Sequence, residues 1–475
     1  MRRLLILPFL LIFVLMSSCK TVEVGALTTK PIEQYLNKGK SQLSKLANIN
    51  LTKDDEEKRI EVKSLGNLLA ESRSKRRLQG NLSESVEYIL GIDPAINAAY
   101  DQLLAKELSA NISRSQKDIV VSGTVYGGIE DITDNNKGVA FVVNANRLLY
   151  DSGKVDAQVA ADVYHAESAR HALKAAIEER AKNLVILWVE LDRYRLLNDL
   201  VDSRLEVLGP LIGQLEKVAS AGVGDVAQVS AAQRTVSMVK VKKEELSKSL
   251  DIANLNFTNS FGELPSKIDF DYELISNVTP LEISEAMVKE APLLLAAYAS
   301  YKASEADIAV IQTNDKVSLG LQARAARPFA GSTYDSDESI GLVLNKTLYQ
   351  GDLLRTQTTQ AEATMRSNVS KLQAAYSDGE RAVRSAIQSI ISAKKTILIA
   401  RENAQAASSE VAYLRKQLII GGSTLESVLS AEALRYEAES REINYRAEMV
   451  KAQLSVLSGL GLLTDSLKLN VSKFF

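Results

Sequence analysis

The 475-residue sequence has little of what a disulfide-linked, nucleotide-hydrolysing or metal-dependent protein needs. Its only cysteine, Cys19, has no internal partner for a disulfide. The two histidines, His165 and His171, lie six positions apart, a spacing that does not align them on one helical face. There is no GxxxxGK[ST] phosphate-binding loop. We therefore expect no metal site, no cofactor and no catalytic residues, and we predict that the protein is not an enzyme.

Aromatic residues are also scarce, at 5% of the chain, and the formal net charge is only -2. A nearly neutral chain gives no reason to expect nucleic acid as a partner. The 46% of hydrophobic residues is dominated by small and aliphatic side chains, a composition typical of long packed helices. Trp188, the single tryptophan, is expected to be a packing or interface residue.

Long hydrophobic runs are absent beyond the amino terminus, so no later segment offers the ~18 apolar residues of a spanning helix. Residues 1–19 have two arginines, an apolar run and then Ser17, Ser18 and Cys19, the pattern of a secretory signal. The MSSC stretch resembles the bacterial lipobox, which implies lipidation of Cys19; a coincidental buried thiol is the alternative. Residues 20–81 form a polar amino-terminal extension, expected to be solvated helix or linker, with docking as the alternative.

The rest of the chain contains an internal repeat. NRLLYDSGKV (146–155) recurs as NKTLYQGDLL (345–354), which places Tyr150 and Tyr349 199 positions apart. Other landmarks share this spacing, namely Gly222 with Gly421, Val229 with Val428, and Gly262 with Gly461. Such self-similarity indicates one structural unit used twice. We place the first copy at 82–265 and the second, with the carboxyl-terminal segment, at 266–475.

Each copy contains two segments with the alternation of a β-strand. In KVSLGLQARAARPF, Val317, Leu319 and Leu321 fall on one side, and polar or small residues fall on the other. SIGLVLNK (339–346) follows after a polar turn, and SQKDIVVSGTVYGG and GVAFVVNAN (138–146) are the counterparts in the first copy. Four strands cannot close into a barrel within one chain. If their apolar side faces lipid, oligomerisation must complete the barrel.

Each hairpin of strands is followed by a long helical segment. From Leu372 to Leu418, apolar or small residues recur at alternating steps of three and four, the spacing of a coiled-coil seam. A helix over 352–420 would be roughly 100 Å long. The first copy offers 154–219, where Gly209 and Pro210 are expected to introduce a kink.

Glycine-containing turns, SAGVGD (220–225) and IGGST (420–424), end both long helices. Asp225 and Thr424 are candidate caps for the return helices, 226–261 and 425–457. A further helix over 292–314 is expected to continue the first return helix end to end. The sequence thus predicts a mainly α fold with a small membrane β-barrel contribution, in which a strand hairpin and a long α-hairpin are duplicated.

These features resemble the TolC-like outer membrane factor family. LYQGD (348–352) is similar to the family's strand-to-helix junction, LSESVEYILGIDPAINAAY (82–100) to its opening helix, and GGSTLESVLSAEALRYEAE (421–439) to its second hairpin tip. The resemblance implies a homotrimer with a 12-stranded barrel in the outer membrane and a periplasmic α-helical cylinder. Thr347 and Leu148 depart from the family's proline before the junction aromatic.

The resemblance also implies that both tips dock a periplasmic adaptor (membrane fusion) protein. The positions of this sequence that match the family's docking residues are Gly222, Val223, Gly224, Asp225, Gly421, Gly422, Ser423 and Thr424. A tight turn is the alternative role for their glycines. At the pore entrance, the implied residues are Gln228, Glu426, Ser427 and Ser430. Family members carry aspartates where Ser427 and Ser430 stand, and Glu426 could restore an acidic ring; a solvated surface glutamate is the alternative.

The function expected from this resemblance is a passive, gated export duct in the outer membrane of a Gram-negative bacterium, extending into the periplasm. Its partners would be two further copies of the chain, the adaptor, an inner membrane pump or ABC exporter, and outer membrane lipid. The alternative is a lipid-anchored, non-conducting coiled-coil scaffold or adhesin. The cargo, small molecule or secreted protein, stays open at this point.

Overall fold

The computed structural model describes residues 76–131, 136–220, 226–266, 285–329, 332, 336–420 and 422–471. Cys19, the signal segment and most of the amino-terminal extension lie outside these residues, so the expectations about them stay predictions. The chain divides into two compact units. Segments 119–147 and 320–343 belong to one, which contains most of the sheet, and the helices make up the other; each is described by itself.

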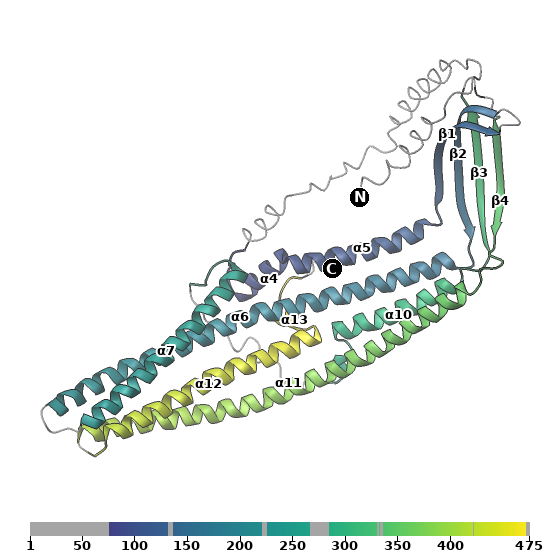
Figure 1. The fold of residues 1–475 in the computed structure, drawn as a ribbon. Coiled ribbons are helices and arrows are strands. Elements are labelled where there is room, and N and C mark those ends of the chain that lie inside the picture. Colours follow the sequence, from purple (N-terminus) through teal and green to yellow (C-terminus); the bar gives the residue numbers. More distant parts are fainter. Residues whose placement is uncertain are drawn as a thin grey trace, which may run out of the picture. The chain divides into compact units, whose positions relative to one another are not determined.

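The sheet has four strands in the order β1-β2-β3-β4, all in the part of the chain that the structure describes (Figure 1). The strands are β1 (Ile119–Asp131), β2 (Asn136–Tyr150), β3 (Ser318–Pro328) and β4 (Asp337–Asn345). β1 and β2 pair antiparallel, with Ile119 opposite Arg147 and Gly128 opposite Gly138. The predicted strand hairpins of both copies are therefore confirmed.

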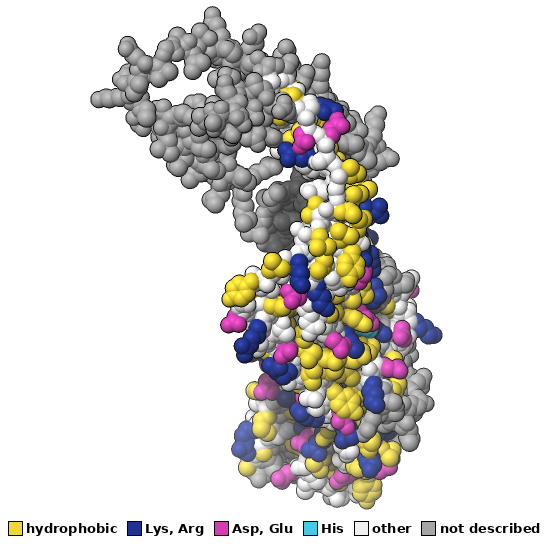
Figure 2. Space-filling view, turned by 90° about the vertical axis from the view of Figure 1, so that its right-hand side faces the viewer, with side chains coloured by type: hydrophobic (Ala, Val, Ile, Leu, Met, Phe, Trp, Pro, Cys, Tyr) yellow, Lys and Arg dark blue, Asp and Glu magenta, His cyan; other side chains and the backbone are white. Residues whose placement is uncertain are grey.

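Both outer strands of this sheet have a hydrogen-bonded neighbour on one side only, because β1 and β4 end the strand order. On β4, Ile340, Leu342 and Leu344 alternate along the strand and are between 65% and 76% exposed. Figure 2 shows hydrophobic side chains gathered along the strands. An exposed, apolar edge strand is a template for pairing with a further strand, so the sheet formed by the described residues has an edge that can accept one.

The helical unit repeats two lengths. The long helices α6 and α11 each have 67 residues, and the return helices α7 and α12 each have 36. None of the helices in the described ranges is long and apolar enough to cross a membrane. The helices are α4 (Leu82–Ile92), α5 (Pro94–Ser115), α6 (Lys154–Ser220), α7 (Val226–Phe261), α9 (Glu285–Val288), α10 (Pro292–Gln312), α11 (Leu353–Ile419), α12 (Leu425–Leu460) and α13 (Leu463–Ser466).

The long helices organise the packing: α6 contacts α5, α7, α10 and α12, and α11 contacts α10 and α12 (Figure 1). α6 continues through Pro210 as one helix. The expectation that 292–314 continues the first return helix is wrong. α10 begins where α12 ends, since a Cβ on Gly461 would lie 2.6 Å from Pro292 Cγ. The end of α7 does not continue into α10, because α7 contacts α4 instead. A connection of 30 residues separates Phe261 from Pro292, which is long enough to reach the second hairpin.

The predicted seam of α11 is buried or half-buried along its whole length. Ile390 and Val411 are almost completely buried, and Ala400, Ala404 and Ala407 are buried as well. The charged residues that flank the seam, Lys394, Lys395 and Arg401 among them, are exposed. Alanines in the seam let α12 approach α11 closely, so the hairpin is stabilised by close packing along its length.

The largest hydrophobic core surrounds Trp188 on α6, which is nearly fully buried. Its ring meets Phe257 of α7 edge-on, with centroids 5.1 Å apart, and Phe257 stacks on Phe261 at 4.5 Å. Such aromatic pairs contribute beyond the area that they bury. Trp188 is therefore a packing residue within the chain.

The carboxyl-terminal strap, residues 463–471, is held by a buried carboxylate. Glu178 of α6 accepts hydrogen bonds from the backbone N–H of Leu463 (2.9 Å) and from Thr464 Oγ1 (2.5 Å). Asn470 N–H donates to Glu87 of α4 (3.1 Å), and Leu467 packs into the core around Trp188. Burial raises the pKa of the Glu178 carboxyl, although the hydrogen bonds from Thr464 and Leu463 oppose this change.

This raised pKa predicts a pH dependence of stability. The folded chain keeps a proton on Glu178 at pH values where the unfolded chain, with a pKa near 4.5, has lost it. Stability therefore falls as pH rises from about 4.5 through the raised pKa, by at most about 1.4 kcal/mol per pH unit. In Glu178→Gln this contribution should disappear, and the melting temperature followed by circular dichroism should depend less on pH in this window. Glu179→Gln, at the exposed neighbouring position, is the control, and parallel profiles for all three proteins would contradict the assignment.

Candidate functional site: the tip of the second helical hairpin

The second tip is the turn between α11 and α12, residues 420–424. The structure describes all of these residues except Gly421. Gly422 N–H donates to Gln417 O (2.8 Å), and Ser423 Oγ donates to Leu414 O (2.8 Å). Thr424 caps α12, because its Oγ1 accepts a hydrogen bond from Ser427 N–H (3.2 Å). The predicted cap is confirmed at Thr424, and the turn is closed by its own polar groups.

The structure brings three of the predicted entrance residues together on the first two turns of α12. Glu426 and Ser430 are exposed, and Ser427 is half-buried. The Ser427 hydroxyl donates to Thr424 O (2.6 Å) and so belongs to the cap. The fourth predicted entrance residue, Gln228, lies in α7, and the structure does not describe its side chain. The predicted docking residues Gly222, Val223, Gly224, Asp225 and Gly421 also lie outside the described residues.

Gly422 does not need to be glycine for the conformation of this turn. Its φ is not among the positive values of the described glycines. A Cβ would lie 2.2 Å from Gln417 Oε1, the far end of a flexible side chain that can rotate away. A tight turn alone therefore does not account for glycine at this position.

A buried charge cluster that no sequence pattern had indicated lies behind the tip. The Glu432 side chain on α12 is completely buried and pairs with Arg415 on α11, while Arg435 Nε lies 3.6 Å from Glu432 Oε2. Burying a carboxylate is costly unless it is paired. The pair therefore fixes α11 against α12 just above the turn. The spacing of Glu432, Arg435 and Glu439 along one helix was the available signal, but it is indistinguishable from ordinary surface i to i+4 pairs.

A second contact of this cluster connects the two hairpins. The Arg204 guanidinium of α6 lies over the ring of Tyr436 of α12, 4.9 Å from its centroid. Burial lowers the pKa of Arg204 and raises the pKa of Tyr436. The partly buried cation–π contact links the first hairpin to the second in the same region of α12 as Glu432.

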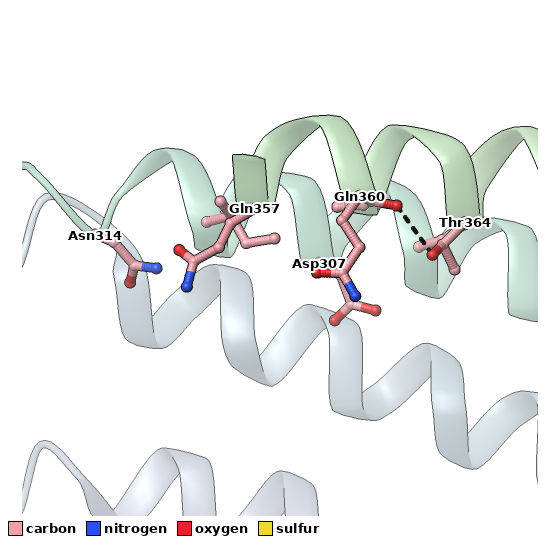
Figure 3. A pocket seen from close by; sticks show the side chains of 8 residues that line it. Asp307, Asn314, Gln357, Gln360 and Thr364 are labelled. Carbon is pink, nitrogen blue, oxygen red and sulfur yellow. Dashed lines mark hydrogen bonds between the residues drawn. The ribbon is translucent and has the colours of Figure 1, made fainter. Parts of the chain in front are cut away.

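A polar pocket of 330 Å³ lies between α10 and α11 (Figure 3). Asp307 of α10 and Asn314 in the turn after this helix line one side of the pocket, and Gln357, Gln360 and Thr364 line it from α11. Thr364 Oγ1 donates to the Gln360 carbonyl, and His165 Nε2 of α6 lies 3.4 Å from Asp307 Oδ2. One carboxylate among neutral amides suits water and neutral polar groups better than a metal ion. Within the described ranges, no three His, Cys, Asp or Glu side chains gather at a possible metal site.

Comparison with known proteins agrees with this architecture. Residues 283–462 match the family described as Outer membrane efflux protein. The matched segment is an outer membrane efflux protein domain. This domain contains α9, α10, β3, β4, α11 and α12, and with them the second tip and the cluster around Glu432.

The chain is also similar to a curated protein in sequence and to solved structures in fold. Outer membrane protein TolC of Escherichia coli (strain K12) is 27% identical over 143 residues, an alignment that spans 29% of this chain and 29% of TolC. The fold is similar to VceC from Vibrio cholerae, with a TM-score of 0.69, 17% identity, and 80% and 96% of the two chains covered. CusC, whose structures describe transmembrane channel formation, gives a TM-score of 0.72 at 14% identity, covering 82% and 93%. The TolC-like fold therefore extends over both copies.

The buried pair behind the tip of the efflux protein domain leads to a prediction. Glu432→Gln removes the charge that Arg415 neutralises, and should lower stability by about 1–3 kcal/mol, because Arg415 is one-third exposed and solvent offsets part of the loss. Hydrogen–deuterium exchange should increase in peptides spanning 411–440 and stay unchanged around Glu178. Glu437→Gln, which removes an exposed partner of Arg441 on the same helix, is the control. Equal exchange in both variants would show that the pair does not hold the hairpin.

Proposed function

We propose that the protein is an outer membrane export channel, the passive trans-periplasmic duct of a tripartite efflux pump or type I secretion system. The observation that carries the proposal is the TolC-like fold with an open four-stranded sheet whose edge strand β4 is apolar and exposed. Three such sheets supply the twelve strands of a closed barrel, which leaves no edge in hydrocarbon. The protein would then be located in the outer membrane of a Gram-negative bacterium, with its helices in the periplasm.

A second apolar seam on α7 supports assembly into a homotrimer. One side of α7 packs on α6 through Ala232, Val239 and Leu246. On another side, Val241, Ile252 and Leu255 are exposed, and their numbers fit steps of three and four with the charged residues Glu245 and Lys248 between them. A helix with two apolar seams is expected to have two helical neighbours. A second copy of the chain supplies the missing neighbour in this proposal.

The hairpin tips are proposed to dock a periplasmic adaptor, which in turn engages an inner membrane pump or ABC exporter. At the second tip, Gly422 and Thr424 are exposed, and Gly422 has no conformational need to be glycine. Where the backbone of another chain must come close to a surface, glycine is favoured because it has no side chain. The contacts at Arg415–Glu432 and Arg204–Tyr436 hold the hairpins while the duct is closed. With energy supplied by its partners, the duct itself needs no catalytic residues.

The alternative is a lipid-anchored scaffold or adhesin that does not conduct. Such a rod has no use for strand hairpins with an exposed apolar edge, so the residues on β4 favour the channel.

The channel is tested by the mass and the conductance of the detergent-extracted protein. We expect a trimeric mass and discrete conductance steps in planar bilayers. Val241→Asp, in the exposed seam of α7, should lower the trimer fraction and the frequency of conductance steps at least about tenfold, because the new carboxylate removes an apolar contact and lies one helical turn from Glu245. Lys240→Asp introduces the same side chain at an exposed position outside the seam and should behave like the wild type. A well-folded monomer, or bilayers that stay insulating, would contradict the proposal.

The acidic ring at the entrance has its own test. In a trimer, three copies of the exposed Glu426 would surround one axis and favour cations. Glu426→Gln should lower the cation-to-anion permeability ratio of single channels. Glu448→Gln, an exposed position farther along α12, should leave the ratio unchanged. An unaltered ratio in Glu426→Gln would make this glutamate an ordinary solvated residue.

A further inference from the structure

A cavity of 560 Å³ lies between the two helical hairpins, where Arg204 meets Tyr436. Its walls come from three helices: α6 and α7 of the first hairpin, and α12 of the second. α6 contacts both of the other helices in the helical unit. A cavity of this volume is within the range of sites for small molecules.

The lining of the cavity is partly apolar and partly polar. Tyr436 and Val239 are buried, whereas Met238 is 66% exposed and marks the side on which the cavity opens to solvent. Thr235 and Ser440 contribute hydroxyl groups. Such a lining fits a ligand that has an apolar body and one polar end.

Arg204 is a cation without an acceptor. Its guanidinium lies over the ring of Tyr436, 4.9 Å from the centroid, and its Nε is buried without a hydrogen bond. Within the described ranges this arginine forms no ion pair. A guanidinium has five N–H donors in a planar fork, and a carboxylate is the acceptor that matches this fork best.

The other charged side chains that line the cavity are paired. Lys242 Nζ lies 3.0 Å from a carboxylate oxygen of Glu245, and Arg441 Nη2 lies 3.3 Å from one of Glu437. These pairs cancel each other's charge, so the unbalanced charge of the cavity is the one on Arg204.

Glu432 does not balance Arg204, although its charge acts on it. Burial lowers the pKa of Arg204, and Glu432 is among the groups that oppose this change. The Glu432 carboxylate is completely buried and already pairs with Arg415, while Arg435 lies on its other oxygen. One further negative charge at Arg204 therefore completes the cavity without breaking an existing pair.

The cavity is separate from the surfaces used by the proposed channel. Lys242 follows Val241 and so lies about 100° farther around α7 than the seam proposed for the subunit contact. Tyr436 comes 12 residues after Thr424 along α12, which places it roughly 18 Å from the tip. Neither the subunit contact nor a partner at the tip is needed to fill the cavity.

We propose that this cavity binds one small organic anion, a monocarboxylate with an apolar or aromatic body. Its carboxylate accepts hydrogen bonds from the Arg204 guanidinium, and its body lies against Val239 and Met238, whose flexible thioether adapts to the shape of a ligand. Because both hairpins line the cavity, a bound anion also joins them. This inference goes beyond the proposed function and does not depend on conduction.

The test is a saturation-transfer difference NMR titration of the detergent-extracted full chain with phenylacetate and with phenylacetamide, its neutral counterpart of the same shape. Phenylacetate should bind with a dissociation constant at least about tenfold lower than phenylacetamide, because only the acid carries the charge that Arg204 lacks. Arg204→Gln should abolish this difference. Arg195→Gln, a half-buried arginine on the same helix outside the cavity, should keep it. Equal binding of acid and amide to the wild type, or an unchanged difference in Arg204→Gln, would overturn the proposal.

A second variant leaves the contact between Arg204 and Tyr436 in place. Met238→Glu puts a carboxylate at the exposed side of the cavity and should weaken phenylacetate binding at least about fivefold through repulsion of like charges. Lys240→Glu, an exposed position of α7 outside the cavity, is the control and should bind like the wild type. Equal affinities in these two variants would show that the anion lies elsewhere.

The position and the chemical class of the ligand are checked separately. Saturating phenylacetate should slow hydrogen–deuterium exchange in peptides spanning 200–210 and 430–441, one from each hairpin, and protection confined to other peptides would contradict the site. Acetate at the same concentration should not displace phenylacetate, because it lacks the apolar body. Displacement by acetate would show that the cavity binds charge alone and would overturn the assignment to an organic anion. A conducting trimer that fails these binding tests refutes only this inference, whereas an insulating monomer refutes the proposed function.

Discussion

The structure depends on one constraint: a β-sheet in contact with hydrocarbon must leave no backbone hydrogen-bonding group unpaired. In the described residues the sheet has four strands, and its outer strands β1 and β4 each have a hydrogen-bonded neighbour on one side only. The apolar side chains of β4 make that edge unfavourable in water as well as in lipid. In the channel proposed above, assembly with further copies of the chain would complete the sheet, and the exposed residues of α7 would supply a contact between the helices of those copies.

The helical hairpins meet a different requirement, which is to be long and yet well packed. Among the described residues, only a small hydrophobic cluster surrounds α11. The small side chains along its seam let α12 pack closely against it. Three aromatic side chains, Trp188, Phe257 and Phe261, pack together in the largest core cluster. The strap at 463–471 closes that region, and Glu178 satisfies the backbone groups at its start. Two smaller clusters of buried residues continue the packing, one toward the tips around Leu208 and Leu425, and one between α11 and α12 around Ile390 and Val456.

Charges are buried where two elements must be held in one arrangement. Glu432 with Arg415 sets α11 against α12, and Arg204 with Tyr436 sets α6 against α12. A buried ion pair contributes little net stability compared with apolar packing, but it penalises every arrangement that separates its members. In the proposed channel, that property would limit the hairpins to a few defined positions.

The sequence by itself determined the elements and their duplication. Strand alternation, the three-and-four seam and the repeat at 199 positions are local patterns of backbone geometry, and they predicted β1 to β4, the lengths of α6 and α11, and the cap at Thr424. Only the tertiary structure decided which ends meet, because α10 begins against α12 and not after α7, and no local pattern encodes a contact across 30 residues of connection. It also decided which charges are buried: the spacing of Glu432 and Arg435 is that of a surface pair, and Glu178 meets its partners nearly 300 residues away. Burial is a property of what packs on a side chain, and the sequence around that side chain does not contain it.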